Sequence, residues 1–339
     1  MKWTFIALIA SLILTVSCSD SKHERLLGES IGAQSEVLLV ADRAILQSDV
    51  ADTLDEVLCG PTPGLNQNEP FFRLIHLAKE DYVRKYTAMH SILIVTIGNQ
   101  PATQPSSNQE PTIGVAYDER AKPQTIVQVT APSLEALRTF LPTHKQTIRD
   151  LLVDGQLNTM ARQLKRRHSK VVADDLSRLY GYTISVPEEI KFDKKGKDFL
   201  WASDKRDEKN QNFVFYTYPY TGDSLLTETC FAHHRDSVMK ANIPGSTPSQ
   251  WMSTVWEGDE PIIKNRLRRI DGRVVCEVRG LWEMHDGAMG GPFVSLAQVD
   301  TAKGRMVVVE GFIFSPSTNK RDLIRTMEAS LRTLVHTKQ

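Results

Sequence analysis

The stretch Asn212-Phe213-Val214-Phe215-Tyr216-Thr217-Tyr218 carries uncharged, mostly apolar or aromatic side chains at every position. Successive side chains of a β-strand point to opposite faces, so Phe213 and Phe215 share one face while Val214 and Tyr216 share the other. A strand without a polar face is typical of the centre of a sheet that is covered on both sides. The stretch therefore predicts a sheet with packing layers above and below it.

More strands are expected around this central one, and alternating or β-branched runs predict them at 182–186, 198–203, 252–256, 262–268, 273–281, 293–299 and 305–314. Asp271-Gly272 is the turn of a tight hairpin between two of them. Helices are predicted over 227–240 and over 319–334, where Leu323, Ile324 and Met327 begin an apolar stripe.

The earlier part of the chain also mixes strands and helices. Strands are predicted at 36–41, 71–77, 91–97, 112–117 and 125–129, and helices at 43–58, at 80–89 and from 133 to 178 with a break at Pro142. Residues 99–111 read as a polar, Pro-rich loop. Leu179-Tyr180-Gly181-Tyr182 marks a boundary, so we expect an N-terminal α+β half at 35–178 and a C-terminal α+β half at 179–337.

These elements predict an α+β fold, with mostly antiparallel sheets and helices packed on them. A strand leads through Pro132-Ser133 into a helix in the first half, and another leads through Pro316-Ser317 into a helix in the second. This short echo indicates two related αβ-sandwich halves.

The charge balance excludes one class of function. Among 339 residues, Lys and Arg number 41 and so do Asp and Glu. Nucleic-acid-binding proteins usually carry a clear basic excess, so we expect no nucleic-acid partner. Apolar residues make up 41% and charged residues 24% of the chain, as in ordinary globular proteins.

The N-terminus has the pattern of an export signal. Met1-Lys2 is followed by an uncharged run at 3–16, which is too short for a membrane span of about 20 residues and fits a signal peptide over 1–17. Leu14-Thr15-Val16-Ser17-Cys18 resembles the lipobox of bacterial lipoproteins, with Thr15 where Leu is usual. The resemblance implies cleavage before Cys18 and attachment of palmitate-type acyl chains to it, with 18–34 as a tether. An ordinary secretory leader with an incidental cysteine is the alternative.

The other cysteines, Cys59, Cys230 and Cys276, allow at most one disulfide. Cys230 shares a predicted helix face with His233 or His234, which could hold a metal in principle. A structural zinc site needs four ligands, and no second cluster at ligand spacing accompanies this one. We therefore expect no metal and no cofactor.

Weak candidates for catalysis lie near a Gly-rich loop at 287–291. Glu283, His285 and Asp286 are titratable groups beside this loop, and Arg235 is a fourth candidate from the helix at 227–240. However, a loop that holds phosphate usually opens a helix, and this one opens a strand. A long hairpin connection without chemistry is the alternative.

Two basic segments also call for partners. The basic run at 162–170, with Lys165-Arg166-Arg167 at its centre, could contact anionic lipid headgroups or a polyanion, or it could be a solvated helix face. Lys320-Arg321 falls in the first turn of a helix, where the helix dipole disfavours positive charge. We expect Glu283, an anionic ligand or a salt bridge within the fold to compensate it, and the salt bridge is favoured.

Several of these segments together resemble an uncharacterised family of bacterial envelope lipoproteins, a domain of unknown function, over residues 35 to 336. The segments are Glu69-Pro70-Phe71, Tyr180-Gly181-Tyr182, Asp198-Phe199-Leu200-Trp201, Tyr218-Pro219-Tyr220, Arg235-Asp236-Ser237, Ile243-Pro244-Gly245, Arg279-Gly280-Leu281-Trp282, Met289-Gly290-Gly291-Pro292-Phe293 and Lys320-Arg321, together with the lipobox. The resemblance implies an exported, lipid-anchored protein and transfers no catalytic residue.

The sequence thus predicts a lipid-anchored protein of the cell envelope, in the outer membrane, that binds a partner or has a structural role. The membrane is its first partner, through Cys18, and an unknown protein or small molecule is the second. One alternative is an unrecognised hydrolase or transferase with its site near 279–293. Another is an assembly factor that presents the aromatic strand at 213–220 or the basic helix.

Overall fold

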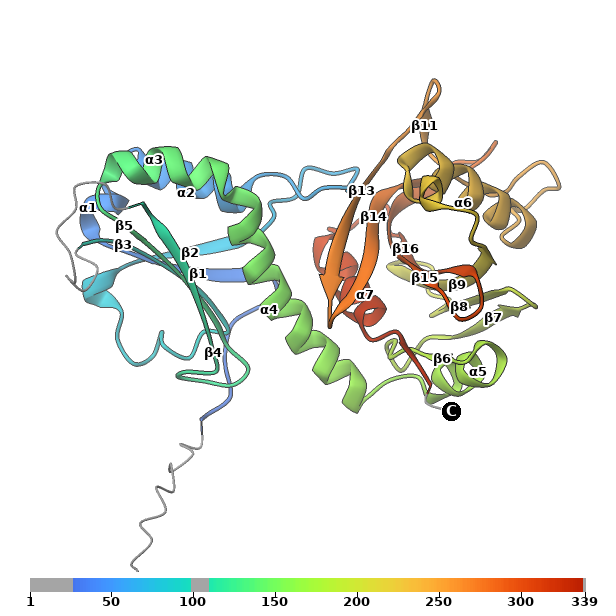
Figure 1. Ribbon diagram of the computed structural model, residues 1–339, viewed down its shortest axis with the longest axis horizontal. Coiled ribbons are helices and arrows are strands. Elements are labelled where there is room, and N and C mark those ends of the chain that lie inside the picture. The colour runs from blue at the N-terminus through green and yellow to red at the C-terminus, as the bar shows by residue number, and fades with distance from the viewer. Residues whose placement is uncertain (1–26, 99–109, 338–339) are drawn as a thin grey trace, which may run out of the picture.

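The computed structural model describes residues 27–98 and 110–337. They form two sheets, each with its own helices, and the long helix α4 (Lys145–Arg166) runs from the first half along the second (Figure 1). The predicted leader, Cys18 and nearly all of the predicted loop at 99–111 lie outside the described residues. No helix in the two described ranges is both long and apolar enough to cross a membrane.

The N-terminal sheet has five strands in the order β2-β1-β3-β5-β4. Their bounds are β1 Glu36–Ala41, β2 Arg73–Ala78, β3 Ser91–Ile97, β4 Thr112–Tyr117 and β5 Thr125–Ala131. The pairs β1–β2, β1–β3 and β3–β5 are parallel, and the edge pair β4–β5 is antiparallel.

Helices cover one face of this sheet. They are α2 (Val50–Cys59), α3 (Leu134–Thr143) and α4, after a short α1 (Arg43–Leu46). Apolar side chains from β1, β3 and β5 meet those of the three helices in one core. On the other face, a segment that includes Tyr82, Tyr86 and Met89 packs over Leu38 and Val40.

The C-terminal sheet is antiparallel, in the order β10-β14-β15-β16-β9-β8-β7, with β13 paired to β14. Its strands are β7 Lys191–Lys195, β8 Phe199–Ser203, β9 Asn210–Pro219, β10 Met252–Thr254, β13 Ile263–Ile270, β14 Arg273–Met284, β15 Gly290–Asp300 and β16 Arg305–Phe314. Two small pairs, β6 (Tyr182–Thr183) with β17 (Val335–His336) and β11 (Trp256–Glu257) with β12 (Glu260–Pro261), complete the half.

Helices lie on both faces of this second sheet. Helix α6 (Glu228–Asn242) packs on one face, while α5 (Lys170–Tyr180) and α7 (Arg321–Arg332) pack on the other. Phe213 and Phe215 of β9 belong to the core under α5 and α7, and Val214 and Tyr216 belong to the core under α6. The prediction of a central strand covered on both sides is confirmed, and residues 213–217 of the proposed aromatic interface are buried within the fold.

The α+β class is confirmed, and antiparallel pairing dominates the larger sheet. The smaller sheet is mostly parallel and has helices on one face only, so the two halves differ in topology. The helix predicted at 80–89 is wrong: only a 3-10 turn, Lys79–Asp81, forms there, and a second one lies at Asp223–Leu226. Tyr82, Tyr86 and Met89 turn toward the sheet instead, because its second face would otherwise lose its apolar cover.

Helix α7 joins the two halves. Its Ala329 is fully buried in the core of the N-terminal half. Its first turn is capped by Glu69, whose carboxylate accepts hydrogen bonds from the backbone N–H groups of Lys320 at 2.6 Å and Arg321 at 3.0 Å. The side chain of Arg321 forms an ion pair with Asp322 at 2.9 Å, so the favoured salt bridge within the fold is confirmed for Arg321. The ammonium of Lys320 donates to Gln67 Oε1 and to the carbonyl of Thr318, and the suggested role of Glu283 is wrong.

Candidate functional site

Arg235 is a core residue rather than an open binding group. Its side chain is fully buried under α6, and it forms a two-pronged ion pair with the equally buried Glu310 of β16, with Nη2 2.8 Å from Oε1. Its guanidinium also lies 4.0 Å from the ring centre of Phe293. Burial alone would lower the pKa of Arg235, but the charge and hydrogen bonds of Glu310 raise it.

Neighbouring polar groups complete this buried cluster. Ser295 donates to Glu310 at 2.7 Å, and Arg235 donates to the hydroxyl of Thr254 at 3.1 Å. Asp236 accepts from the backbone and hydroxyl of Thr254 and from the indole N–H of Trp256. Because the guanidinium and both carboxylates have partners, the cluster is organised for stability and leaves Arg235 no capacity for a substrate.

Glu283, His285 and Asp286 lie elsewhere, at the exposed connection between β14 and β15. Glu283 pairs with Ser253 in the ladder to β10, and the ring of His285 stacks on Trp251 at 4.1 Å. His285 Nε2 and Asp286 Oδ2 are 3.8 Å apart, with both side chains largely in solvent. Arg235 is fully buried in the core while these three side chains lie at the exposed connection, and no cavity that we find in the described residues is lined by any of the four. The structure therefore does not bring the four candidates together.

The glycines of this connection have a packing role. A Cβ on Gly291 would lie 2.1 Å from the backbone carbonyl oxygen of Ile313, and one on Gly290 would lie 2.9 Å from that of Trp282. The indole of Trp282 donates to the same Ile313 carbonyl at 3.1 Å. Glycine is therefore required here by the close approach of neighbouring strands, which explains the motif without a ligand.

The cysteine and histidine candidates are also dispersed. Cys59, Cys230 and Cys276 are free thiols, so they form no disulfide. His233 packs on the ring of Trp256 and His234 stacks on Tyr218. Within 27–98 and 110–337 no group of three or more His, Cys, Asp or Glu residues is placed to hold a metal ion.

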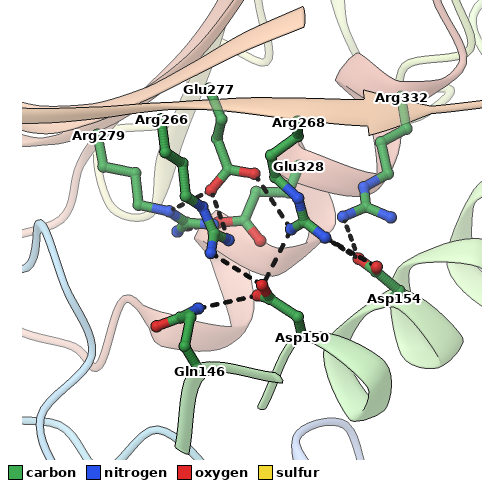
Figure 2. Close-up of polar contacts among 9 residues, drawn as sticks. All are labelled: Gln146, Asp150, Asp154, Arg266, Arg268, Glu277, Arg279, Glu328 and Arg332. Atoms are coloured by element: carbon green, nitrogen blue, oxygen red, sulfur yellow. Dashed lines mark hydrogen bonds and ion pairs between the residues drawn. The ribbon is translucent and has the colours of Figure 1, made fainter. Parts of the chain in front are cut away.

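A network of charged side chains joins the two halves instead (Figure 2). It contains four arginines and four carboxylates, from α4, α7 and the hairpin β13–β14: Arg266, Arg268, Arg279, Arg332, Asp150, Asp154, Glu277 and Glu328. We call it the interface network. Asp154 of α4 accepts from Arg268 at 2.8 Å and from Arg332 at 2.6 Å, which ties the N-terminal half to both β13 and α7.

Glu277 is the centre of the interface network. Its carboxylate lies 3.0 Å from Arg279, 3.2 Å from Arg266 and 3.5 Å from Arg268. Burial alone would raise the pKa of Glu277, but these arginines, led by Arg279, lower it to about 2. The residue is therefore ionised at neutral pH although its side chain is only 5% exposed.

A cavity of about 250 Å³ lies beside this network, between the halves. Pro63 and Phe71 line it from the loop before β2, and Val153 lines it from α4. Polar and charged side chains from α4, β13, β14 and α7 complete its wall. We call it the interface cavity. A larger groove of about 1020 Å³ beside the hairpin is lined by Leu267 and Val274 among others, but none of its lining residues has a buried polar atom without a partner.

Sequence reasoning missed the interface network and the cavity. Asp150 and Arg266 are 116 residues apart in the chain and Asp154 and Arg332 are 178 apart, so no local motif contains both partners. The one available signal was the alternation of Arg266 and Arg268 on a strand, which places two cations on the same face. The basic run at Lys165-Arg166-Arg167 spans the end of α4, and Arg167 pairs with Glu188 at 2.6 Å.

Comparison with known proteins does not indicate a function for this chain. No curated protein matches the chain. The Ran-binding protein Mog1p of Saccharomyces cerevisiae aligns at 12% identity over 47% of this chain and 93% of that one, with a TM-score of 0.31. A protein of Bacteroides thetaiotaomicron VPI-5482 aligns at 11% identity over 47% of this chain and 46% of that one, with a TM-score of 0.26. The lipid transfer and protein localization domain of human StarD13 aligns at 8% identity over 42% of this chain and 86% of that one, with a TM-score of 0.22. All three TM-scores lie below 0.5, so no conclusion follows from them.

Family models are more informative about extent. The model of a domain of unknown function, DUF8532, matches residues 30–165, and that of a second, DUF4837, matches residues 169–333. The expected resemblance to a domain of unknown function is thus confirmed, but two such domains match where one family was expected from the sequence. Together these models cover most of the chain, which is therefore similar to two families described as domains of unknown function.

Proposed function

We propose that this chain is a lipid-anchored envelope protein that binds a ligand without transforming it. In this proposal the leader at 1–17 directs export, acyl chains on Cys18 hold the mature protein in the outer membrane, and residues 18–34 tether the folded part. Several acyl chains on one cysteine hold a protein far more firmly than one.

One observation carries the binding role. The interface cavity is lined by segments of both halves and by charged side chains, and ligand sites commonly lie where two packed units meet. The lack of a common pocket for the four weak catalytic candidates leaves the hydrolase or transferase alternative without support from the described residues.

The anchor is tested by expressing the full-length chain in a Gram-negative bacterium and separating soluble from membrane fractions. We expect the wild type and a Cys59→Ser control in the membrane fraction as the cleaved form. Cys18→Ser should instead be released or accumulate uncleaved. A cleaved Cys18→Ser protein that stays with the membrane would contradict the proposed anchor.

The binding role is tested by thermal unfolding of the purified chain against a panel of small neutral, anionic and cationic solutes. A ligand of the folded state raises Tm by mass action. Val153 is buried in the cavity wall, so Val153→Phe should fill part of the space and reduce the shift. If no solute in the panel raises Tm, or if Val153→Phe shifts as much as the wild type, the cavity is not a ligand site.

A further inference from the structure

The interface cavity has more positive than negative side chains in its wall. Three carboxylates line it, Asp150, Glu277 and Glu328. Five basic side chains line it as well, namely Arg149, Lys264, Arg266, Arg279 and Arg325. Lys264 is 84% exposed and lies 3.3 Å from Glu228, which is not part of the wall. The remaining four basic and three acidic side chains leave a formal excess of one positive charge.

The carboxylates of the wall are already engaged by other cations. Asp150 lies 3.0 Å from Arg266, and Glu277 lies between Arg266 and Arg279. Glu328 is ion-paired with Arg279, although neither of its buried carboxylate oxygens has a hydrogen-bond partner. The excess of positive charge therefore falls on side chains outside these pairs.

Arg325 of α7 is the first such side chain. It is only 3% exposed, its Nη2 donates to the carbonyl of Phe71 at 3.1 Å, and its Nη1 has no hydrogen-bond partner. No carboxylate among the described residues lies within 4 Å of its guanidinium. Burial, together with the charges of Arg279 and Arg321, lowers the pKa of Arg325 to about 10, although Glu328 partly opposes this.

Arg149 of α4 is the second. It is 6% exposed, its Nε donates to the carbonyl of Val57 at 2.6 Å, and its Nη2 has no hydrogen-bond partner. In the described ranges it likewise lacks a carboxylate within 4 Å, and burial lowers the pKa of its guanidinium. Both Arg149 and Arg325 lie over the ring of Phe71, at 4.5 and 4.6 Å from its centre.

Two buried guanidinium groups without an anionic partner are unusual. Removing a charge from water is costly unless an opposite charge or a full set of hydrogen bonds compensates it. Here both cations lie over one ring, and they are compensated by a carbonyl for each, by the weaker attraction of the ring face and, for Arg325, by the charge of Glu328. An anion bound in the interface cavity would compensate the charges of these two guanidinium groups.

We propose that the interface cavity binds a small oxyanion with two negative charges, either a phosphate group or a dicarboxylate, with Arg149 and Arg325 of its wall as the cationic side chains that hold it. This identification rests on the binding role proposed above. The volume equals that of roughly eight waters at ~30 Å³ each, which suits phosphate or a four-carbon diacid. Guanidinium groups bind the oxygens of both ligands through paired N–H donors.

Such a ligand would act on the contact between the halves. Arg149 belongs to the N-terminal half and Arg325 to α7 of the C-terminal half, so one anion would neutralise a charge on each. Binding is therefore expected to tighten the interface as well as to fill the cavity.

The test is calorimetric titration of the purified chain with inorganic phosphate and with succinate, in a low-salt buffer, with glycerol as the neutral solute. We expect one of the two anions to bind with 1:1 stoichiometry. The anion that binds more tightly shows whether the cavity prefers a phosphate group or a dicarboxylate. Arg325→Gln should weaken binding by about tenfold or more, because it removes one of two charges that face the ligand. Arg138→Gln, which removes an exposed cation on α3, should leave the affinity within about twofold.

Two outcomes would overturn the proposal: neither anion binds with a Kd below about 10 mM, or Arg325→Gln binds as tightly as the wild type. If Arg325→Gln fails to fold, Val153→Phe provides the test, since it narrows the cavity without changing charge. A neutral or cationic solute that raises Tm through the cavity would refute the anion and leave the binding function standing. No ligand of any class would refute both.

Discussion

Arg235 on α6 and Glu310 on β16 face each other across the C-terminal core with both side chains fully buried and the closest oxygen and nitrogen 2.8 Å apart. A buried ion pair is strongly destabilised when one partner is removed, because the other charge stays behind without compensation. This pair therefore explains why the core under α6 contains a cation, and it gives the first of four predictions.

Arg235→Met should lower the free energy of unfolding by about 3–5 kcal/mol, since Glu310 is left unpaired. The double variant Arg235→Met/Glu310→Leu should recover most of this loss, because it removes both charges and keeps apolar volume. Urea unfolding followed by circular dichroism measures both. A single variant as stable as the wild type would show that the pair does not hold this core together.

Gly291→Ala should destabilise the fold by about 3 kcal/mol, because its Cβ would meet the carbonyl oxygen of Ile313 at 2.1 Å in a rigid sheet. Gly114→Ala is the matched control in the other sheet: a Cβ there meets nothing within 4 Å, and the change is expected to stay within about 0.5 kcal/mol. The comparison uses the same unfolding measurement. Equal stability of both variants would argue that Gly291 is kept for another reason, such as a ligand.

Glu277 should make stability depend on pH in the acid range. Its pKa is lowered to about 2 in the folded state from the usual 4.5, so its contribution is fully present above pH 4.5 and is lost as the pH falls toward 2. The contribution is on the order of 3 kcal/mol. Glu277→Gln should therefore be less stable than the wild type at pH 7, and the difference should narrow steadily below pH 4.5. A difference that stays constant down to pH 3 would contradict the lowered pKa.

Asp154→Asn should weaken the contact between the halves, because its carboxylate bridges Arg268 and Arg332 from α4. The side chain is about one third exposed, so water screens part of the effect and we expect a loss of about 1–2 kcal/mol. Asp52→Asn, an exposed carboxylate on α2, serves as control. Calorimetry should show a lower or broader transition for Asp154→Asn alone; matching transitions for both variants would mean that the interface does not depend on this bridge.

Local patterns predicted the elements well because each pattern reports burial directly. The two apolar faces of the stretch 212–218 indicated β9, and the apolar stripe from Leu323 indicated α7, which forms at Arg321–Arg332. Pro142 lies near the end of α3, where the helical stretch was expected to break.

The pairing of the strands and the ion pairs between distant residues could not be predicted from local sequence patterns. The strands at 36–41 and 91–97 were predicted, but alternation does not distinguish a parallel neighbour from an antiparallel one. Likewise, Arg235 was a weak catalytic candidate on the helix predicted over 227–240. Its partner Glu310 is 75 residues away, and only the fold shows that the two meet.

The position of α7 also sets an order of events during synthesis. Ala329 fills the core of the N-terminal half and Glu69 caps the first turn of α7, so the earlier half reaches its final packing after the last helix has left the ribosome. A chain that stops before residue 321 would lack this contribution. A truncation at the extreme C-terminal end should therefore expose residues in both halves to protease, far beyond the part that is missing.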